Sequence, residues 1–173
     1  MVEILGNWLR PEDVGLEWGS GRSTLWFAQR TSQLVSVEHD ETWYQTVASK
    51  LRNRSLQNVV YKLRTAEADY VAAAQDISPV SLDFCLVDGI ARDSCALASL
   101  PLLKPSAILI LDNCNWYLPS ASRSPSSRTE DEGAATAGWK LFLQETSSWR
   151  RVWTTSGVTD TCLFVKPLSN GTS

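Results

Sequence analysis

Four residues near the start of the chain have the types and spacing of a nucleoside-binding site. Glu17, Gly19 and Gly21 form an acid-x-Gly-x-Gly run, and Glu38 follows 17 residues after Gly21. Glycines let the backbone approach a ligand closely, and a helix that begins at such a turn offers free amides. A carboxylate at the end of the next strand can accept both hydroxyl hydrogens of a ribose. The run therefore predicts a nucleoside ligand.

Three classes of ligand could use this turn. A Walker-type phosphate loop needs Gly-Lys-Ser/Thr, and the turn contains no lysine. A dinucleotide-binding turn has a third glycine at the position that Thr24 occupies here. S-adenosylmethionine carries an amino group, for which Glu17 at a strand end is a suitable partner. We therefore expect S-adenosylmethionine as the ligand. The alternative is a nicotinamide-dependent oxidoreductase, which binding of NAD in preference to S-adenosylhomocysteine would support.

The elements that must position these residues alternate between short apolar runs and helical stretches. Runs that are apolar at successive positions are typical of parallel strands covered on both faces. Alternation at this spacing predicts a doubly wound, Rossmann-like α/β domain. The expected strands are 14–18, 34–38, 58–63, 81–88 and 107–112, and the expected helices are 23–31, a helix capped by Asp40, 67–75 and 94–103.

The pattern changes after the fifth expected strand. Residues 119–138 are rich in Ser, Pro and Thr and predict a long loop, which is a candidate lid over the acceptor. A helix is expected at 139–146, and two more strands at 151–155 and 161–166. Because the gap between these strands is too short for a helical crossover, they must pair antiparallel. We expect one domain over 1–168 and a disordered tail at 169–173.

Four blocks of sequence resemble those of small class I S-adenosylmethionine-dependent methyltransferases. They are LEWGSGRST at 16–24, VSVEHDETWY at 35–44, VDGIARDSC at 87–95, and LLKP at 102–105 continuing to LDN at 111–113. The closing hairpin is similar to the reversed last strand of that family. The family usually has Gly-Gly after Lys104-Pro105, and this chain has Ser106-Ala107 instead. This difference does not affect the expected fold, but the turn need not have the shape that two glycines give it.

The resemblance implies a cofactor site around the glycine turn and the end of the second strand. Glu67 lies where the family often contacts adenine, although an acidic residue at a helix start is an equal interpretation. His39 is interpreted as an ordinary surface or turn residue in preference to a catalytic one. Trp18 and Trp116 lie at strand ends, where their side chains could line a pocket. The cofactor contacts implied are Glu17, Trp18, Gly19, Ser20, Gly21, Ser23, Thr24, Glu38, His39, Glu67 and Asp88.

The acceptor side is expected at the ends of the fourth and fifth strands. Methyl transfer is an in-line displacement, so the protein mainly orients the nucleophile and excludes water. The resemblance makes Asp88 the catalytic residue, and the substrate-side candidates are Arg92, Asp112, Asn113 and Trp116.

The same strand ends raise the question of a metal. Asp88, Asp112 and Asn113 are similar to the Mg²⁺ ligands of catechol-type O-methyltransferases, and an all-oxygen set suits a hard cation. Those enzymes usually carry a lysine soon after the first Asp, where this chain has Gly-Ile-Ala-Arg at 89–92. Because Asp-Asn is also common turn chemistry, we favour a turn over a Mg²⁺ site here.

Composition restricts the partners and the compartment. A net charge of −3 and a pI of about 5.2 give no evidence for nucleic-acid binding. The four cysteines show no Cys-x-x-Cys spacing, and the three that lie in or beside apolar runs are expected to be buried, reduced thiols. No signal peptide or membrane span is visible, so a cytoplasmic protein is expected. The predicted function is S-adenosylmethionine-dependent methyl transfer to a small molecule. The alternative is a non-catalytic protein of the same fold that binds a nucleoside or a protein partner.

Overall fold

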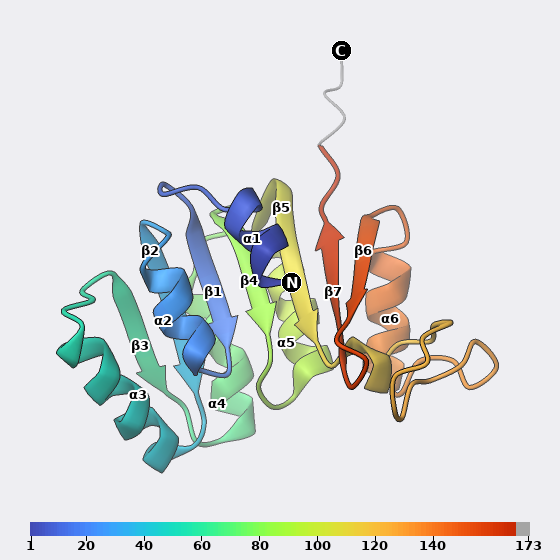
Figure 1. Ribbon diagram of the computed structural model, residues 1–173, viewed down its shortest axis with the longest axis horizontal. Coiled ribbons are helices and arrows are strands. Elements are labelled where there is room, and N and C mark those ends of the chain that lie inside the picture. Colours follow the sequence, from blue (N-terminus) through green and yellow to red (C-terminus); the bar gives the residue numbers. More distant parts are fainter. Residues whose placement is uncertain (169–173) are drawn as a thin grey trace.

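A seven-stranded sheet with the order β3-β2-β1-β4-β5-β7-β6 forms the centre of the computed structural model, which describes residues 1–168 (Figure 1). The first five strands in this order pair in parallel, and β7 pairs antiparallel with both β5 and β6. The chain winds outward in opposite directions from β1 and β4, which places a crevice at the carboxyl ends of these two strands. The strands are β1 (Val14–Trp18), β2 (Gln33–Glu38), β3 (Val59–Leu63), β4 (Leu82–Val87), β5 (Leu103–Asp112), β6 (Arg150–Thr155) and β7 (Asp160–Val165).

Helices cover both faces of the sheet, which explains the continuous apolar runs in its central strands (Figure 1). One face carries α1 (Val2–Trp8), α2 (Arg22–Ala28) and α3 (Glu41–Asn53). The other face carries α4 (Glu67–Ala72), α5 (Arg92–Ser99) and α6 (Ala137–Glu145). Short 3-10 turns lie at η1 (Ala73–Asp76), η2 (Leu100–Leu102) and η3 (Cys114–Trp116).

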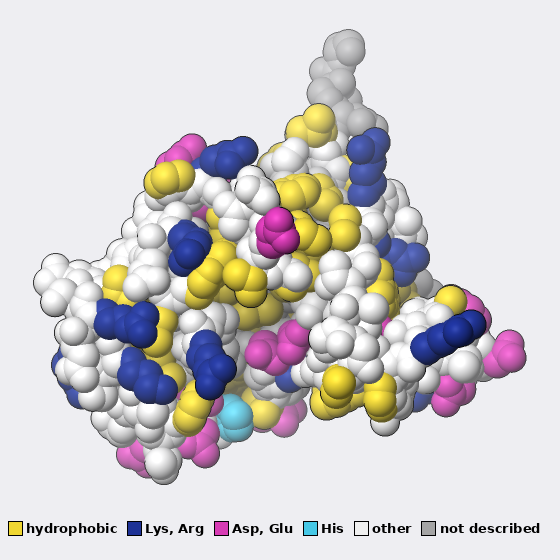
Figure 2. Space-filling view, viewed as in Figure 1, with side chains coloured by type: hydrophobic (Ala, Val, Ile, Leu, Met, Phe, Trp, Pro, Cys, Tyr) yellow, Lys and Arg dark blue, Asp and Glu magenta, His cyan; other side chains and the backbone are white. Residues whose placement is uncertain are grey.

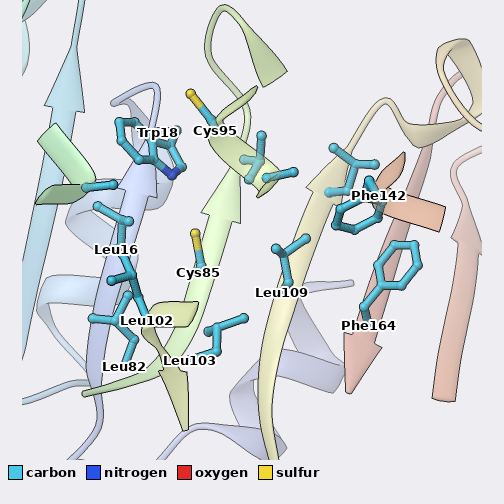
Figure 3. Close-up of a cluster of buried hydrophobic side chains, with 14 of the residues drawn as sticks. Leu16, Trp18, Leu82, Cys85, Cys95, Leu102, Leu103, Leu109, Phe142 and Phe164 are labelled. Atoms are coloured by element: carbon cyan, nitrogen blue, oxygen red, sulfur yellow. The ribbon is translucent and has the colours of Figure 1, made fainter. Parts of the chain in front are cut away.

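The larger apolar core lies between the sheet and the second helical layer (Figure 3). Leu16, Cys85 and Leu109 from three neighbouring strands meet side chains from α5, α6 and β7 there. All four cysteines are buried and free, where burial was predicted for three of them, and burial raises the pKa of Cys85 to about 12. A separate cluster on the opposite face packs Leu5 and Phe27 against the sheet.

The predicted fold class is confirmed, including the antiparallel hairpin at the end of the chain. Asp40 caps α3 as predicted, because its side chain accepts a hydrogen bond from the Trp43 amide at 2.6 Å. Helix α1 was not predicted, since its seven residues are too few to show a clear apolar period.

The beginning of β5 also differs from the prediction, because the strand starts at Leu103 and its pairing with β4 shifts register between Leu82 and Phe84. Ser106 has a φ of +66°, in the left-handed region that glycine normally occupies. Ser106 therefore adopts a left-handed backbone conformation at a turn where the resemblance leads one to expect glycine.

Two further predictions concern the end of the chain and the membrane. The predicted tail at 169–173 lies outside the described residues. Across residues 1–168, none of the helices combines the length and the apolar character that crossing a membrane requires.

Candidate functional site

The turn between β1 and α2 is held against the start of the loop after β4. Gly19 has a φ of +89°, and its amide donates a hydrogen bond to the Val37 carbonyl at 2.9 Å. A Cβ on Gly19 would lie 2.7 Å from the Gly89 nitrogen and 2.8 Å from the Asp88 carbonyl carbon, so any larger residue must displace backbone. A Cβ on Gly21 would meet no protein atom within 4 Å, so the protein's own packing does not require glycine there.

Glu17 lies directly beneath this turn and is fully buried. Its Oε2 accepts hydrogen bonds from the Thr24 hydroxyl at 2.5 Å and from the Ser36 hydroxyl at 2.7 Å. Its Oε1 is buried and has no hydrogen-bond partner among the described residues. Burial raises the pKa of Glu17 to about 7, because the charged form loses its hydration while neutral hydroxyls compensate only in part. An incoming positive group would satisfy this oxygen and restore the charge.

Glu38 ends β2 and is also buried, but both of its oxygens are already engaged. Its Oε2 accepts from the amide and the hydroxyl of Ser20, at 3.0 and 2.7 Å. Its Oε1 accepts from the amides of His39 and Asp40, at 2.8 and 2.9 Å, and His39 Nδ1 lies 3.0 Å away. The carboxylate is therefore fixed in position by backbone amides on both sides, with one hydroxyl and one imidazole at its remaining positions.

A cavity of about 360 Å³ opens beside Glu38 at the carboxyl ends of β1, β2 and β4, and Glu17 is not among its lining residues. Trp43, which was not predicted, lines this cavity, and its Nε1 donates to the Ser20 carbonyl at 2.7 Å. Trp43 lies in the first turn of the helix that follows Glu38, and this position in the sequence could have identified it as a residue of the cavity. The cavity is lined by Gly19, Ser20, Glu38, His39, Asp40, Trp43, Asp88, Gly89 and Ile90.

Several predicted cofactor contacts lie elsewhere in the structure. The Trp18 side chain is completely buried in the core, where its Nε1 donates to the Ser99 hydroxyl at 3.0 Å, so the interpretation of Trp18 as a pocket wall is wrong. Thr24 and Ser23 lie next to Glu17 instead: the Thr24 hydroxyl donates to its carboxylate, and the Ser23 hydroxyl is close enough to lower its pKa, while Ser23 also lines a separate cavity. Glu67 is exposed in the first turn of α4 and does not line the cavity beside Glu38, which agrees with its interpretation as a helix-start acid. Trp116 is 43% exposed on η3 and lines neither cavity at the strand ends.

Arg92, the first residue of α5, is held by the ends of β4 and β5. Its Nε donates to the Gly89 carbonyl at 2.8 Å, and its Nη1 to the Asp112 carbonyl at 2.7 Å and to Asn113 Oδ1 at 3.1 Å. Its Nη2 donates to the carbonyl and to Oδ1 of Asp88, both at 3.0 Å. A guanidinium has five N–H donors, and these five contacts use them all. The hypothesis that Arg92 grips an acceptor is therefore corrected: the side chain ties two strand ends together.

The three oxygen-bearing side chains considered for a metal are arranged around this guanidinium. Asp88 and Asn113 each direct an oxygen to Arg92, and Asp112 Oδ1 accepts from the Thr161 hydroxyl at 2.7 Å. Asn113 has a φ of +51°, as expected for a turn residue. Arg92 thus engages one side-chain oxygen of Asp88 and one of Asn113, and Thr161 engages one of Asp112, so a cation of the protein already occupies two of the three side chains considered for Mg²⁺. Burial and the neighbouring Asp112 raise the pKa of Asp88 to about 6, and Arg92 opposes this rise.

Residues 119–138 lie beside η3, α6 and the β6–β7 hairpin (Figure 1). Ser124 donates a hydrogen bond to the buried Asp160 at 2.6 Å, and Thr136 donates to Asp93 at 2.6 Å. The cavity between this loop and β6 measures about 920 Å³ and is lined by neither Asp88 nor Asp112. No residue of 119–138 lines either cavity that Asp88 lines.

Known structures resemble this chain closely in fold and only distantly in sequence. The O-methyltransferase TomG from Streptomyces achromogenes, solved in complex with SAM, superposes with a TM-score of 0.68 and 19% identity over 96% of this chain and 78% of that one. A putative O-methyltransferase from Klebsiella pneumoniae gives 0.68 and 18% over 96% and 78%. An rRNA methylase from Streptococcus thermophilus gives 0.63 and 9% over 97% and 94%. Neither a protein-family model nor a curated protein matches the sequence. The chain therefore has the fold of the class I S-adenosylmethionine-dependent methyltransferases.

Proposed function

We propose that this protein binds S-adenosylmethionine beside Glu17 and Glu38 and transfers its methyl group to a small-molecule acceptor. The observation that carries the proposal is the orphaned Oε1 of Glu17, a buried carboxylate oxygen beneath a glycine turn. An unpartnered buried acceptor costs free energy until a donor reaches it. The amino group of S-adenosylmethionine is such a donor, and the SAM complex of TomG supports the same cofactor on this fold.

Glu38 would bind the ribose hydroxyls. The four backbone and side-chain donors that now engage this carboxylate include two amides that the chain fixes, those of His39 and Asp40. The Ser20 hydroxyl and the His39 ring can rotate away without unfolding the turn, and two ribose hydroxyls would replace them. Binding of the cofactor would thus replace internal hydrogen bonds to Glu38 with hydrogen bonds from the ribose. The cavity next to His39 and Trp43 would then hold the adenine ring.

The chemical step needs little from the protein beyond position. S-adenosylmethionine supplies a methyl group on a positively charged sulfur, which is already activated toward a nucleophile. The chain's residues orient the acceptor in line with that bond and keep water out. Asp88 adjoins the cofactor cavity and is the residue that would accept a proton from the acceptor.

A non-catalytic protein of the same fold is the second candidate. The hydrogen bonds to Glu38 favour this second candidate, because both oxygens of the carboxylate already accept hydrogen bonds from the protein's own groups. The two candidates separate in one assay: a catalytic protein consumes S-adenosylmethionine in the presence of an acceptor, and a non-catalytic one binds it unchanged.

Calorimetric titration with S-adenosylhomocysteine tests the cofactor site. Gly19→Ala is expected to lower the affinity at least about 100-fold, because the new Cβ pushes into the backbone at Asp88 and Gly89. Gly157→Ala is the matched control: Gly157 has a φ of +82°, but a Cβ there meets nothing within 4 Å. Both variants carry the same backbone strain, so a loss in Gly19→Ala alone assigns the effect to the turn. Absence of binding in the unaltered protein would overturn the proposal.

A further inference from the structure

A second cavity, of about 360 Å³, lies on the α1–α2 face of the sheet and has a sharply divided lining. Its walls are mostly apolar and come from four elements: Leu5 of α1, Trp26 and Phe27 of α2, Leu86 of β4 and Ile110 of β5, with Arg22 and Ser23 at the start of α2. One end is polar, where the carboxyl groups of Asp88 and Asp112 stand beside Thr161. Figure 2 shows the corresponding arrangement on this face, with acidic side chains at the border of a central apolar patch. A volume at the lower end of the usual range for ligand pockets suits a small molecule.

The polar end of this cavity adjoins the cofactor site. Asp88 lines both this cavity and the one beside Glu38, and Ser23 and Arg22 follow directly on the glycine turn. A molecule whose apolar body fills the α1–α2 cavity would therefore present its polar end to the place where the proposed methyl donor lies. No other cavity described above shares a residue with the cofactor site.

The two carboxyl groups leave specific hydrogen-bonding positions open. Asp88 Oδ1 is taken by Arg92 and Asp112 Oδ1 by Thr161. The second oxygen of each accepts no hydrogen bond from an amide, hydroxyl or guanidinium in the described part of the chain, and the two carboxyl groups lie close enough to share a hydrogen bond with each other when one is protonated. Arg92 pairs with the carboxylate of Asp88, and no lysine or arginine of the described residues lies within ion-pair distance of the Asp112 carboxylate, so Asp112 keeps an uncompensated negative charge. This arrangement attracts a cation with several N–H donors and repels an anion.

We propose that this cavity is the acceptor site and that the acceptor is a small apolar amine. The inference rests on the proposed methyl transfer. An amine can donate to both open oxygens, whereas a hydroxyl can satisfy only one. In the reaction, an N–H proton passes to the carboxyl pair, and the nitrogen lone pair forms a bond to the methyl carbon. The bond from that carbon to sulfur breaks, and its electron pair stays on sulfur to give S-adenosylhomocysteine.

A panel of matched ligands tests the chemistry of the cavity without turnover. Phenethylamine, 2-phenylethanol and phenylacetate share a ring and a short linker, and differ in the polar end. Titrated into the protein saturated with S-adenosylhomocysteine, the amine is expected to bind at least tenfold more tightly than the alcohol, and the carboxylate is expected not to bind. Equal binding of the alcohol, any preference for the carboxylate, or no binding of the amine would overturn the proposal.

Asp112→Asn tests whether binding occurs at this cavity, because Asp112 lines it and does not line the cofactor cavity. The variant is expected to weaken phenethylamine at least tenfold and to leave the affinity for S-adenosylhomocysteine unchanged. Asp76→Asn, which removes an exposed carboxylate paired with Lys62, is the matched control and should change neither. Amine affinity that survives in Asp112→Asn would place the ligand elsewhere and overturn the proposal. Failure of S-adenosylhomocysteine to bind would instead overturn the proposed function, so the two failures are distinguishable.

Discussion

The two pairs of acidic residues at the carboxyl edge of the sheet are stabilised by different means. Glu17 and Glu38, at the carboxyl ends of β1 and β2, are both buried, and neither lies within ion-pair distance of a lysine or arginine in residues 1–168. Hydroxyl groups and backbone amides of their own turns hold them. Asp88 follows β4, Asp112 ends β5, and both are more exposed; Arg92 pairs with the Asp88 carboxylate and donates to the backbone carbonyl of Asp112.

This difference indicates what each pair can bind. A carboxylate that only neutral groups stabilise retains much of its affinity for a positive charge, and Glu17 keeps one oxygen without a partner. In the second pair, Arg92 compensates the charge of Asp88, whereas the Asp112 carboxylate accepts a hydrogen bond from the neutral Thr161 hydroxyl, so this pair selects ligands by their hydrogen bonds and by the sign of the remaining charge. The first pair suits a fixed cofactor, and the second suits an acceptor.

Removal of the internal cation should have the largest effect on stability. Arg92→Met takes away five hydrogen bonds and leaves two facing carboxylates, so we expect the free energy of unfolding to fall by about 3 kcal/mol in urea titrations at pH 7.5. Lys62→Met removes an ion pair with the exposed Asp76 and should cost less than about 0.5 kcal/mol. Equal losses in the two variants would contradict the central role of Arg92.

The double variant Arg92→Met/Asp112→Asn sharpens the same test. If facing carboxylates cause the loss, neutralising one should recover about 1 kcal/mol of the free energy of unfolding relative to Arg92→Met alone. A further loss in the double variant would mean that the hydrogen bonds of Arg92, and not its charge, account for the effect.

Glu17→Gln should change the pH dependence of stability by a smaller amount. The folded pKa of Glu17 is raised from 4.5 to about 7, so its contribution to stability is complete below pH 4.5 and is lost as the pH rises through 7. Glutamine is neutral at every pH. The variant should therefore gain about 2 kcal/mol on the unaltered protein between pH 5 and pH 8. A difference that stays constant over this interval would show that Glu17 titrates normally.

The cofactor side could be predicted from sequence because its residues are neighbours along the chain. The acid-x-Gly-x-Gly run, the carboxylate at the end of β2 and the Asp40 cap depend on local order, and the structure brings Glu17, Gly19 and Glu38 to one edge of the sheet. Trp18 was wrongly interpreted, because the alternation along a strand decides which face a side chain occupies and the run around it is apolar on both faces.

The acceptor side could not be predicted in the same way. The partners of Arg92 on β5 lie about 20 residues away in sequence, and whether its donors are free depends on how two strand ends pack together. The walls of the second cavity come from α1 and α2, and no spacing in the sequence relates Leu5 or Trp26 to Asp112. The composition of the 119–138 loop indicated its length but not the side of the sheet on which it lies.

Ser20→Ala should have the smallest effect and separates the two roles of the groups around Glu38. The Ser20 hydroxyl donates to Glu38 at 2.7 Å and lies 2.5 Å from the Tyr61 hydroxyl, so its loss should lower the free energy of unfolding by about 1 kcal/mol. Because this hydroxyl occupies a position that a ribose hydroxyl would take, its removal frees that position in advance. Calorimetry should then show S-adenosylhomocysteine binding that is tighter by up to about threefold, since the ligand no longer displaces an internal donor. A tenfold loss of affinity would instead mean that Ser20 contacts the ligand directly, and that Glu38 keeps its internal partners when the cofactor binds.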